Sequence, residues 1–306
     1  MVRFMTALAG LFALIAAPVA AQPLVLGTTP NPAPAVVFVA DQQGLFEAHG
    51  VDVEVQIIAT DATIPAALVS GSIALGSVTP TTLLSAVANS IDVVVLSGTT
   101  ETTHDSKDVA ILAGTNSGIQ AAADFAGKTV AVPSLGAVLD VMLRTWLEQN
   151  GVDPESVRIV EIPLPQHPDQ LKAGQIDATI TVDQFAQRIL GESTGILIAH
   201  PLAELPEGEM AAAVVAMRSW AEANADAVAA VQAALTEAGA LGTSNPDVLR
   251  AALGKAMNLP EPIVARIALP FLDTEATVEQ LDWWFGQMQA HAMISGQVDT
   301  SALVWK

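Results

Sequence analysis

Apolar and polar residues follow the same order in two halves of the chain. Each half begins with a short β-rich run, at residues 24–27 and 129–132. A loop rich in Pro, Gly or Ser follows, and then a segment whose apolar residues recur with helical periodicity, at 36–49 and 137–149. Strand, loop and helix in this order, found twice, indicate a duplicated α/β unit.

The helical segment of each repeat ends at a glycine. Gly50 and Gly151 fit the left-handed C′ position that closes many helices. Residues 53–58 then alternate between apolar and polar, which predicts a second strand. Residues 158–162 occupy the same place in the second repeat.

A shared motif, Leu-x-x-Gly-x-Ile, closes both repeats. Its glycines are Gly71 and Gly174, and a strand is predicted after each copy, at 73–76 and 178–181. Strands that alternate with helices predict a mostly parallel sheet flanked by helices. Two such α/β units imply two similar lobes that face one another across a cleft.

The chain has to pass between these lobes twice. Residues 109–113 are predicted to form a strand that leaves lobe one, and 114–118 a flexible entry to lobe two. Residues 210–217 form a β-like run after the return, followed by an alanine-rich helix at 221–240. Two crossings would act as a hinge that absorbs a closing rotation.

The crossings divide the chain into two lobes. We expect lobe one to comprise residues 22–113 and 205–306, with the C-terminal helices, and lobe two to comprise residues 114–204. The aromatic group Trp283-Trp284-Phe285 lies in a helical pattern near the C-terminus. Aromatic residues at helical spacing usually belong to a core, so we expect this group to anchor the C-terminal helices against lobe one.

The N-terminal residues 1–21 have the pattern of a signal peptide. Arg3 precedes the apolar run 7–17, and small residues at 19–21 fit a cleavage site. The apolar run is shorter than the roughly 20 residues that span a bilayer. The chain has no cysteine, and so no residue for lipid attachment. We expect export to the periplasm without a membrane anchor.

The formal charge of −20 argues against nucleic acid and anionic lipid as partners. No two of the five histidines have metal-ligand spacing, so no metal site and no cofactor are predicted.

Gly127-Lys128-Thr129 resembles the end of a phosphate-binding loop, but Ala122 stands where a glycine is required. Ser134 lacks the first glycine of a nucleophile elbow. No catalytic residue is therefore predicted.

Polar residues follow the carboxyl ends of the predicted strands, which is where ligands bind in such sheets. Where a helix begins, free backbone N–H groups can also hold an oxygen-bearing ligand group. The ligand contacts expected from these loops are Thr29, Asn31, Ser77, Thr79, Ser134, Gly136, Ala137, Thr181 and Asp183.

Taken in order, several motifs resemble one known family. They are Gly44-Leu45-Phe46, Gly50-Val51-Asp52-Val53, Leu68-x-x-Gly71-x-Ile73, the run from Asp124 to Val132, and Leu171-x-x-Gly174-Gln175-Ile176-Asp177-Ala178. This set resembles the nitrate, sulfonate and taurine group of ABC-transporter substrate-binding proteins, whose branch includes thiamine-pyrimidine binders. The resemblance runs through most of the chain that follows the signal peptide.

The resemblance implies an α/β protein with the type II periplasmic-binding-protein fold. Two lobes would close over a small-molecule ligand and deliver it to a membrane permease, and the chain would act as a monomer. The resemblance also adds Thr100 and Glu101 to the residues that line the cleft. Where the family often has Glu-Pro, this chain reads Asp183-Gln184.

The residues of the predicted loops limit the class of ligand. They hold no Lys or Arg, whereas Glu101 and Asp183 would lie on opposite lobes and suit an amine. We therefore rank an amine-bearing or neutral organic molecule first and an organosulfonate such as taurine second. Two other functions stay open, namely an exported sensor domain and a family-related enzyme of pyrimidine or menaquinone biosynthesis.

Overall fold

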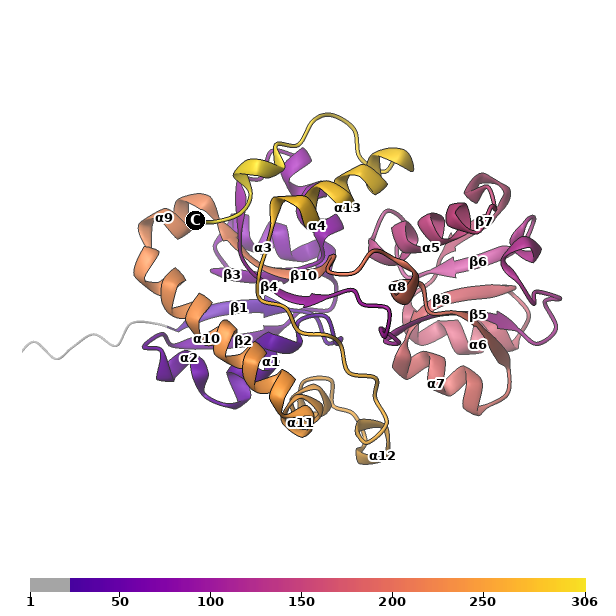
Figure 1. Cartoon of the computed structure of the whole chain (residues 1–306), viewed down its shortest axis with the longest axis horizontal. Helices are drawn as coiled ribbons and strands as arrows, with labels where there is room; N and C mark the ends of the chain where they lie inside the picture. The colour runs from indigo at the N-terminus through magenta and orange to yellow at the C-terminus, as the bar shows by residue number, and fades with distance from the viewer. Residues whose placement is uncertain (1–22) are drawn as a thin grey trace, which may run out of the picture.

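The computed structural model describes residues 23–306, so the predicted signal peptide lies outside the described residues. Two lobes stand side by side, each built on a five-stranded sheet (Figure 1). Among the described residues, no helix combines the length and apolarity that crossing a membrane requires.

The sheet of lobe one has the strand order β2-β1-β3-β10-β4. Its strands are β1 (Leu24–Thr28), β2 (Val53–Ile57), β3 (Leu75–Val78), β4 (Val93–Glu101) and β10 (Met210–Met217). β10 runs antiparallel to both of its neighbours, and the other four strands share one direction. The prediction of a mostly parallel sheet is confirmed.

The sheet of lobe two repeats this plan with the order β7-β6-β8-β5-β9. Its strands are β5 (Val109–Gly114), β6 (Thr129–Val132), β7 (Arg158–Glu161), β8 (Ala178–Val182) and β9 (Gly195–Ala199). β5 takes the antiparallel place that β10 has in lobe one. The matching orders β2-β1-β3 and β7-β6-β8 confirm the duplicated unit.

One boundary predicted from the sequence is wrong. β5 was expected to leave lobe one, but it lies between β8 and β9 in the second sheet. The crossing therefore lies before Val109 and not at residues 114–118. The sequence pattern of an apolar strand is the same in either lobe, because only its long-range pairing partners decide which sheet it joins.

Helices cover both sheets. Lobe one carries α1 (Ala35–Gln42), α2 (Leu45–Ala48), α3 (Ile64–Ser70), α4 (Pro80–Ala88), α9 (Arg218–Ala223), α10 (Ala225–Ser244), α11 (Pro246–Ala256), α12 (Glu261–Val264) and α13 (Val278–Ala290). Lobe two carries α5 (Val138–Gln149), α6 (His167–Lys172), α7 (Asp183–Gly191) and α8 (Pro201–Glu204).

Left-handed glycines close the repeated helices. Gly71 and Gly174, the glycines of the shared motif, have φ angles of 71° and 67°, and Gly50 and Gly151 are also left-handed. The helix predicted over residues 36–49 is in fact two helices, α1 and α2. Gly44, with a φ of 68°, separates them, because a left-handed residue cannot continue a right-handed helix.

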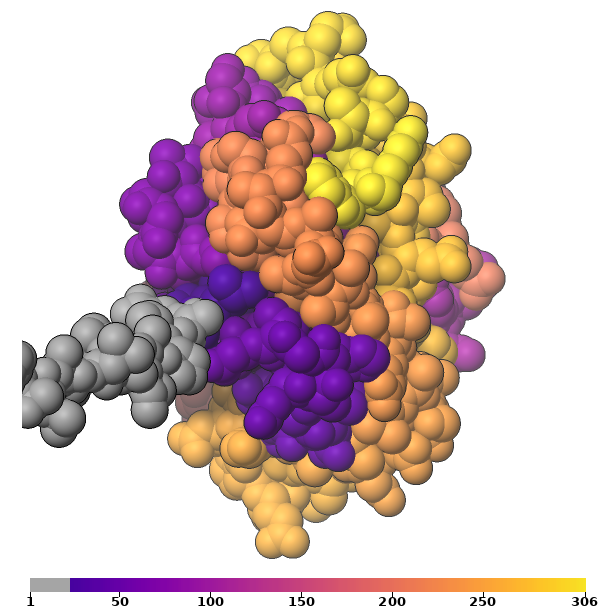
Figure 2. All heavy atoms as spheres, turned by 90° about the vertical axis from the view of Figure 1, so that its left-hand side faces the viewer, coloured from indigo at the N-terminus to yellow at the C-terminus, as the bar shows by residue number. Residues whose placement is uncertain are grey.

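The C-terminal residues complete lobe one. Figure 2 shows α9 and α10 beside the last residues of the chain at the end of the lobe remote from lobe two. Trp284 is fully buried, and its Nε1 donates a hydrogen bond to the carbonyl oxygen of Met210 at 2.7 Å. The predicted anchoring of the C-terminal helices on lobe one is thus confirmed for Trp284.

Candidate functional site

Two hydrogen-bonded crossings join the lobes. The backbone N–H of Thr102 donates to the carbonyl of Glu209, and that of Gly208 donates to the carbonyl of Thr102, both at 2.9 Å. The first crossing connects β4 to β5, and the second connects β9 through α8 to β10. Paired in this way, they form the two-crossing hinge at the base of the space between the lobes.

The strand ends of the two lobes face one another across this hinge. α4 and α13 of lobe one contact α5 of lobe two. There Thr145 Oγ1 donates to Gln287 Oε1 at 3.1 Å. In a second interlobe contact, the backbone N–H of Ala268 donates to Asp183 Oδ2 at 3.3 Å. These contacts tie lobe one to lobe two at α5 and at α7.

The β1–α1 loop is held by its own polar groups and by two threonines of β4. Asn31 donates to Thr29 Oγ1 at 2.9 Å and accepts from the Ala33 N–H at 3.0 Å. The hydroxyls of Thr99 and Thr100 both donate to the Ala33 carbonyl, at 2.8 and 2.9 Å. The predicted contact Thr100 is buried and fixes this loop in place.

A carboxylate occupies the N-terminus of α4. Asp61 Oδ2 accepts from Thr79 Oγ1 at 2.6 Å, from Thr82 Oγ1 at 2.5 Å and from the Thr79 N–H at 3.3 Å. Burial raises the pKa of Asp61, and the hydrogen bonds from Thr79 and Thr82 act against that rise. Ser77, the other residue predicted here, is buried within β3.

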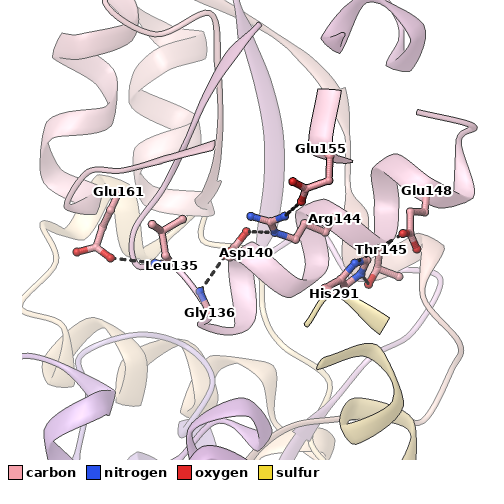
Figure 3. Close-up of polar contacts among 9 residues, drawn as sticks. All are labelled: Leu135, Gly136, Asp140, Arg144, Thr145, Glu148, Glu155, Glu161 and His291. Carbon is pink, nitrogen blue, oxygen red and sulfur yellow. Dashed lines mark hydrogen bonds and ion pairs between the residues drawn. The ribbon is translucent and has the colours of Figure 1, made fainter. Parts of the chain in front are cut away.

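Two more carboxylates bind backbone N–H groups in the loop that precedes α5 (Figure 3). Glu161 Oε2 accepts from the Leu135 N–H at 2.9 Å and from Ser134 Oγ at 3.3 Å. Asp140 Oδ2 accepts from the Gly136 N–H at 2.8 Å. The N–H groups of Leu135 and Gly136, in the loop predicted to bind a ligand, therefore already have partners.

One of these two carboxylates, Asp140, is also paired with an arginine. Arg144 Nε donates to Asp140 at 2.9 Å, and its Nη1 donates to Glu155 at 3.2 Å. Ala137 precedes the first residue of α5 and has an extended backbone, as expected for an N-cap position.

The N-terminus of α7 is buried and acidic. The Asp183 carboxylate accepts from Ala268 and from Gln187 Nε2, the latter at 3.1 Å. Burial raises the pKa of nearby Asp108 to about 6, with Asp183 adding to the rise and His200 opposing it. Thr181 is fully buried, and its hydroxyl has no hydrogen-bond partner among residues 23–306.

Carboxyl groups also gather on the hinge. Burial raises the pKa of Glu101, and the negative charges of Asp273 and Glu207 raise it further. Burial alone raises the pKa of Glu209 to about 7. Glu209 Oε2 is buried and has no hydrogen-bond partner among the described residues.

The sequence predictions missed Asp61, Glu161 and Glu209. Asp61 follows β2 and Glu161 ends β7, which are equivalent strands of the two repeats. The rule that ligands meet the carboxyl ends of parallel strands covers these strands too, but the predictions used only the ends of the first and third strand in each repeat.

Other parts of the described chain offer no competing centre. No three His, Asp or Glu side chains within residues 23–306 group as a metal site. A cavity of about 230 Å³ lies between residues 114–117 and 171–177, at the far end of lobe two from the hinge. Asp177 lies there and binds the N–H of Thr129 at 2.8 Å, which is a structural role.

Two solved structures with a similar fold are those of periplasmic binding proteins. The aliphatic sulphonate binding protein SsuA from Escherichia coli has a TM-score of 0.77 at 21% identity, over 94% of this chain and 93% of that one. The nitrate-binding protein NrtA from Synechocystis PCC 6803 has a TM-score of 0.76 at 16% identity, over 92% and 85%. The predicted periplasmic-binding-protein fold is confirmed.

Sequence comparisons agree with this fold. A curated protein of Brachyspira hyodysenteriae, provisionally named an ABC transporter periplasmic binding protein, is 44% identical over 57 residues. That match spans 19% of this chain and only 16% of the relative. The model of one family, described as NMT1/THI5 like, matches residues 31–248, which is most of the chain. The protein therefore belongs to the NMT1/THI5-like family.

Proposed function

We propose that this protein is the solute-binding component of an ABC importer, exported to the periplasm. It captures a small organic molecule between its lobes and presents it to a membrane permease. The observation that carries this proposal is the pair of duplicated lobes, whose strand ends face each other across two hydrogen-bonded crossings. Membership of the family and the names of SsuA and NrtA support it.

The proposed ligand contacts are the predicted residues that stay partly exposed at the facing strand ends. They are Thr29, Asn31, Thr79, Glu101, Ser134, Gly136 and Ala137. The other four, Ser77, Thr100, Thr181 and Asp183, are buried, and we assign them to the support of these loops.

A solute-binding protein releases its ligand unchanged, whereas an enzyme converts it into product. Native mass spectrometry of the exported protein would reveal a solute that copurifies with it. A thermal-shift panel of amines, sulfonates, pyrimidines and nitrate would then give the ligand class, since a ligand of the folded state raises the Tm by mass action. We expect one class to raise the Tm and to be recovered unchanged, whereas conversion of a hit into product would overturn the proposal.

A further inference from the structure

The side chain of His291 lies buried where the two lobes meet. His291 follows the last residue of α13, and its neighbours Ala290 and Ala292 are exposed, yet its own side chain is only 3% exposed. Its polar neighbours belong to α5 of lobe two (Figure 3). Nε2 lies 3.3 Å from Thr145 Oγ1, and Nδ1 lies 3.7 Å from Glu148 Oε1. Separation of the lobes at α5 would therefore return the imidazole to water.

The backbone of lobe one fixes the position of His291. Ala292, the next residue, has a left-handed φ of 53°, which is uncommon for alanine. Its N–H donates to the Gln289 carbonyl at 3.0 Å, and that of Met293 donates to the Met288 carbonyl at 2.8 Å. Met288 is fully buried in the core. The turn that presents the imidazole to α5 is thus part of lobe one and would stay with it if the lobes moved apart.

The hydrogen bonds at this contact fit a neutral imidazole. The Thr145 hydroxyl donates its single hydrogen to Gln287 Oε1 at 3.1 Å, so it accepts from His291 Nε2. The other nitrogen, Nδ1, then carries no hydrogen in the neutral ring. A proton taken up in acid would bind there and would place a positive charge between the lobes.

The surroundings on lobe two disfavour that charge. Burial lowers the pKa of His291, the negative charges of Glu148 and Asp140 oppose this shift, and the positive charge of Arg144 adds to it. The Glu148 side chain is half exposed, so water screens its attraction for the ring. Asp140 is already paired with Arg144. Burial between the lobes therefore outweighs the attraction of the carboxylates.

The elements of lobe one that pack on α13 do not alter this balance. α4 contains no charged residue. Asp282 and Asp299, where α13 meets the short helix at 300–302, accept hydrogen bonds from Thr300 and Ser301. The C-terminal end of α13 favours a charged imidazole through its dipole, but it acts equally with the lobes together or apart, because both groups belong to lobe one.

We infer that His291 makes lobe closure proton-dependent, so that acid charges the imidazole, releases α13 from α5 and opens the cleft. Closed lobes hold the neutral ring more readily than the charged ring. The free energy of closure from this contact is therefore fully present above the ordinary histidine pKa of about 6.5 and declines as pH falls below it. This inference rests on the proposed function, since it describes a regulation of the same cleft.

The test measures the size of the ligand-free protein at two pH values. Small-angle scattering, extrapolated to zero concentration, gives the radius of gyration at pH 7.5 and at pH 5, and circular dichroism verifies that the protein is folded at both. Carboxyl groups titrate in the same range, since burial raises the pKa of Glu209 to about 7 and that of Asp108 to about 6. The comparison with His291→Gln isolates the histidine. We expect acid to enlarge the radius more in wild type than in this variant.

Two more variants separate proton uptake from a purely structural effect. Glu148→Gln removes the attraction that opposes the fall in the His291 pKa, so the expansion in acid should be larger than in wild type. His49→Gln removes a histidine that pairs with Glu237 inside lobe one, and its expansion should equal that of wild type.

The outcomes separate this inference from the proposed function. An equal response to acid in wild type and His291→Gln would overturn the inference, whatever the protein binds. A contraction in acid that depends on His291, or a smaller expansion in Glu148→Gln than in wild type, would also overturn it. An expansion that depends on His291, in a protein that binds no solute, would support the inference and count against the proposed function.

Discussion

At the scale of single residues, carboxylates bind donors at the strand ends that face the other lobe. Asp61 follows β2 and Glu161 ends β7, which are equivalent strands of the two repeats, and each accepts from a backbone N–H just before a helix of its own lobe. The two repeats thus share an acidic group at an equivalent position as well as a fold. A search for polar residues after every predicted strand would have found Asp61 and Glu161. The position of Glu209 on the hinge follows only from the pairing of β10 with β4, which the sequence does not show.

Asp61 should contribute to stability through its three hydrogen bonds. Asp61→Ala removes the acceptor for Thr79 and Thr82, so we expect a loss of about 1–3 kcal/mol in the free energy of unfolding. Urea unfolding measures this loss. Asp52→Ala, at an exposed position without side-chain contacts, should change the stability by less than about 0.5 kcal/mol. Equal effects would show that the Asp61 contacts are not formed.

Glu209 should make stability depend on pH in a known direction. Its pKa is about 7 in the folded protein, above the ordinary value of 4.5, so the folded state binds more protons between these values. Stability from this group is therefore present below pH 4.5 and is lost as pH rises through 7. Glu101, whose pKa is also raised, acts in the same sense, and Asp273 and Glu207 face it.

The measurement for this prediction compares wild type with Glu209→Gln. Urea midpoints at pH 4.5 to 8 should show the Gln variant gaining stability relative to wild type as pH rises. A constant difference across this range would mean that the Glu209 pKa is not raised.

At the scale of elements, the C-terminal segment depends on a glycine in β4. Gly98 donates its N–H to Thr274, and a Cβ at this position would lie 2.2 Å from the carbonyl oxygen of Glu275. Gly98→Ala should therefore push the segment off the edge of the sheet, at a cost of about 1–3 kcal/mol.

Gly286→Ala is the matched control for this prediction. Gly286 lies inside α13, and nothing lies within 4 Å of an added Cβ. Alanine there should be neutral or should stabilise by up to about 1 kcal/mol. Thermal unfolding compares the two variants, and an unchanged Tm in Gly98→Ala would contradict the packing described here.

Most elements of both repeats were predictable because their signals are local. Apolar periodicity and left-handed glycines located β1, β2, α5 and β8 to within a residue or two. The break at Gly44 was missed because the apolar positions continue through it. The lobe that β5 joins was missed because strand pairing depends on residues far away in the chain.

At the scale of the whole molecule, contacts at α5 and at α7 tie the lobes together away from the hinge, and those at α5 include His291 Nδ1 at 3.7 Å from Glu148 Oε1. Thr145 binds Gln287 and lies 3.3 Å from His291 Nε2, as Figure 3 shows for Thr145 and His291. The contact at α7 joins Ala268 to Asp183. Because C-terminal residues of lobe one form all of these contacts, the C-terminal segment should govern how far the lobes open.

Thr145→Val should loosen the lobes without unfolding them. The change removes the hydroxyl but keeps the shape, so small-angle scattering should give a larger radius of gyration in the ligand-free protein. Thr236→Val, on the exposed side of α10, should leave the radius unchanged. An unchanged radius in Thr145→Val would show that this contact does not hold the lobes together.

Lobe closure around a solute is the central claim, and an interlobe distance tests it most directly. The chain lacks cysteine, so Gln56→Cys near the end of β2 and Gln166→Cys after β7 would place one fluorophore on each lobe. Single-molecule energy transfer is then recorded with a compound that raises the Tm. The account predicts a shift to a shorter distance, with the compound recovered unchanged. Binding that leaves the distance distribution unaltered, or that converts the compound into product, would contradict it.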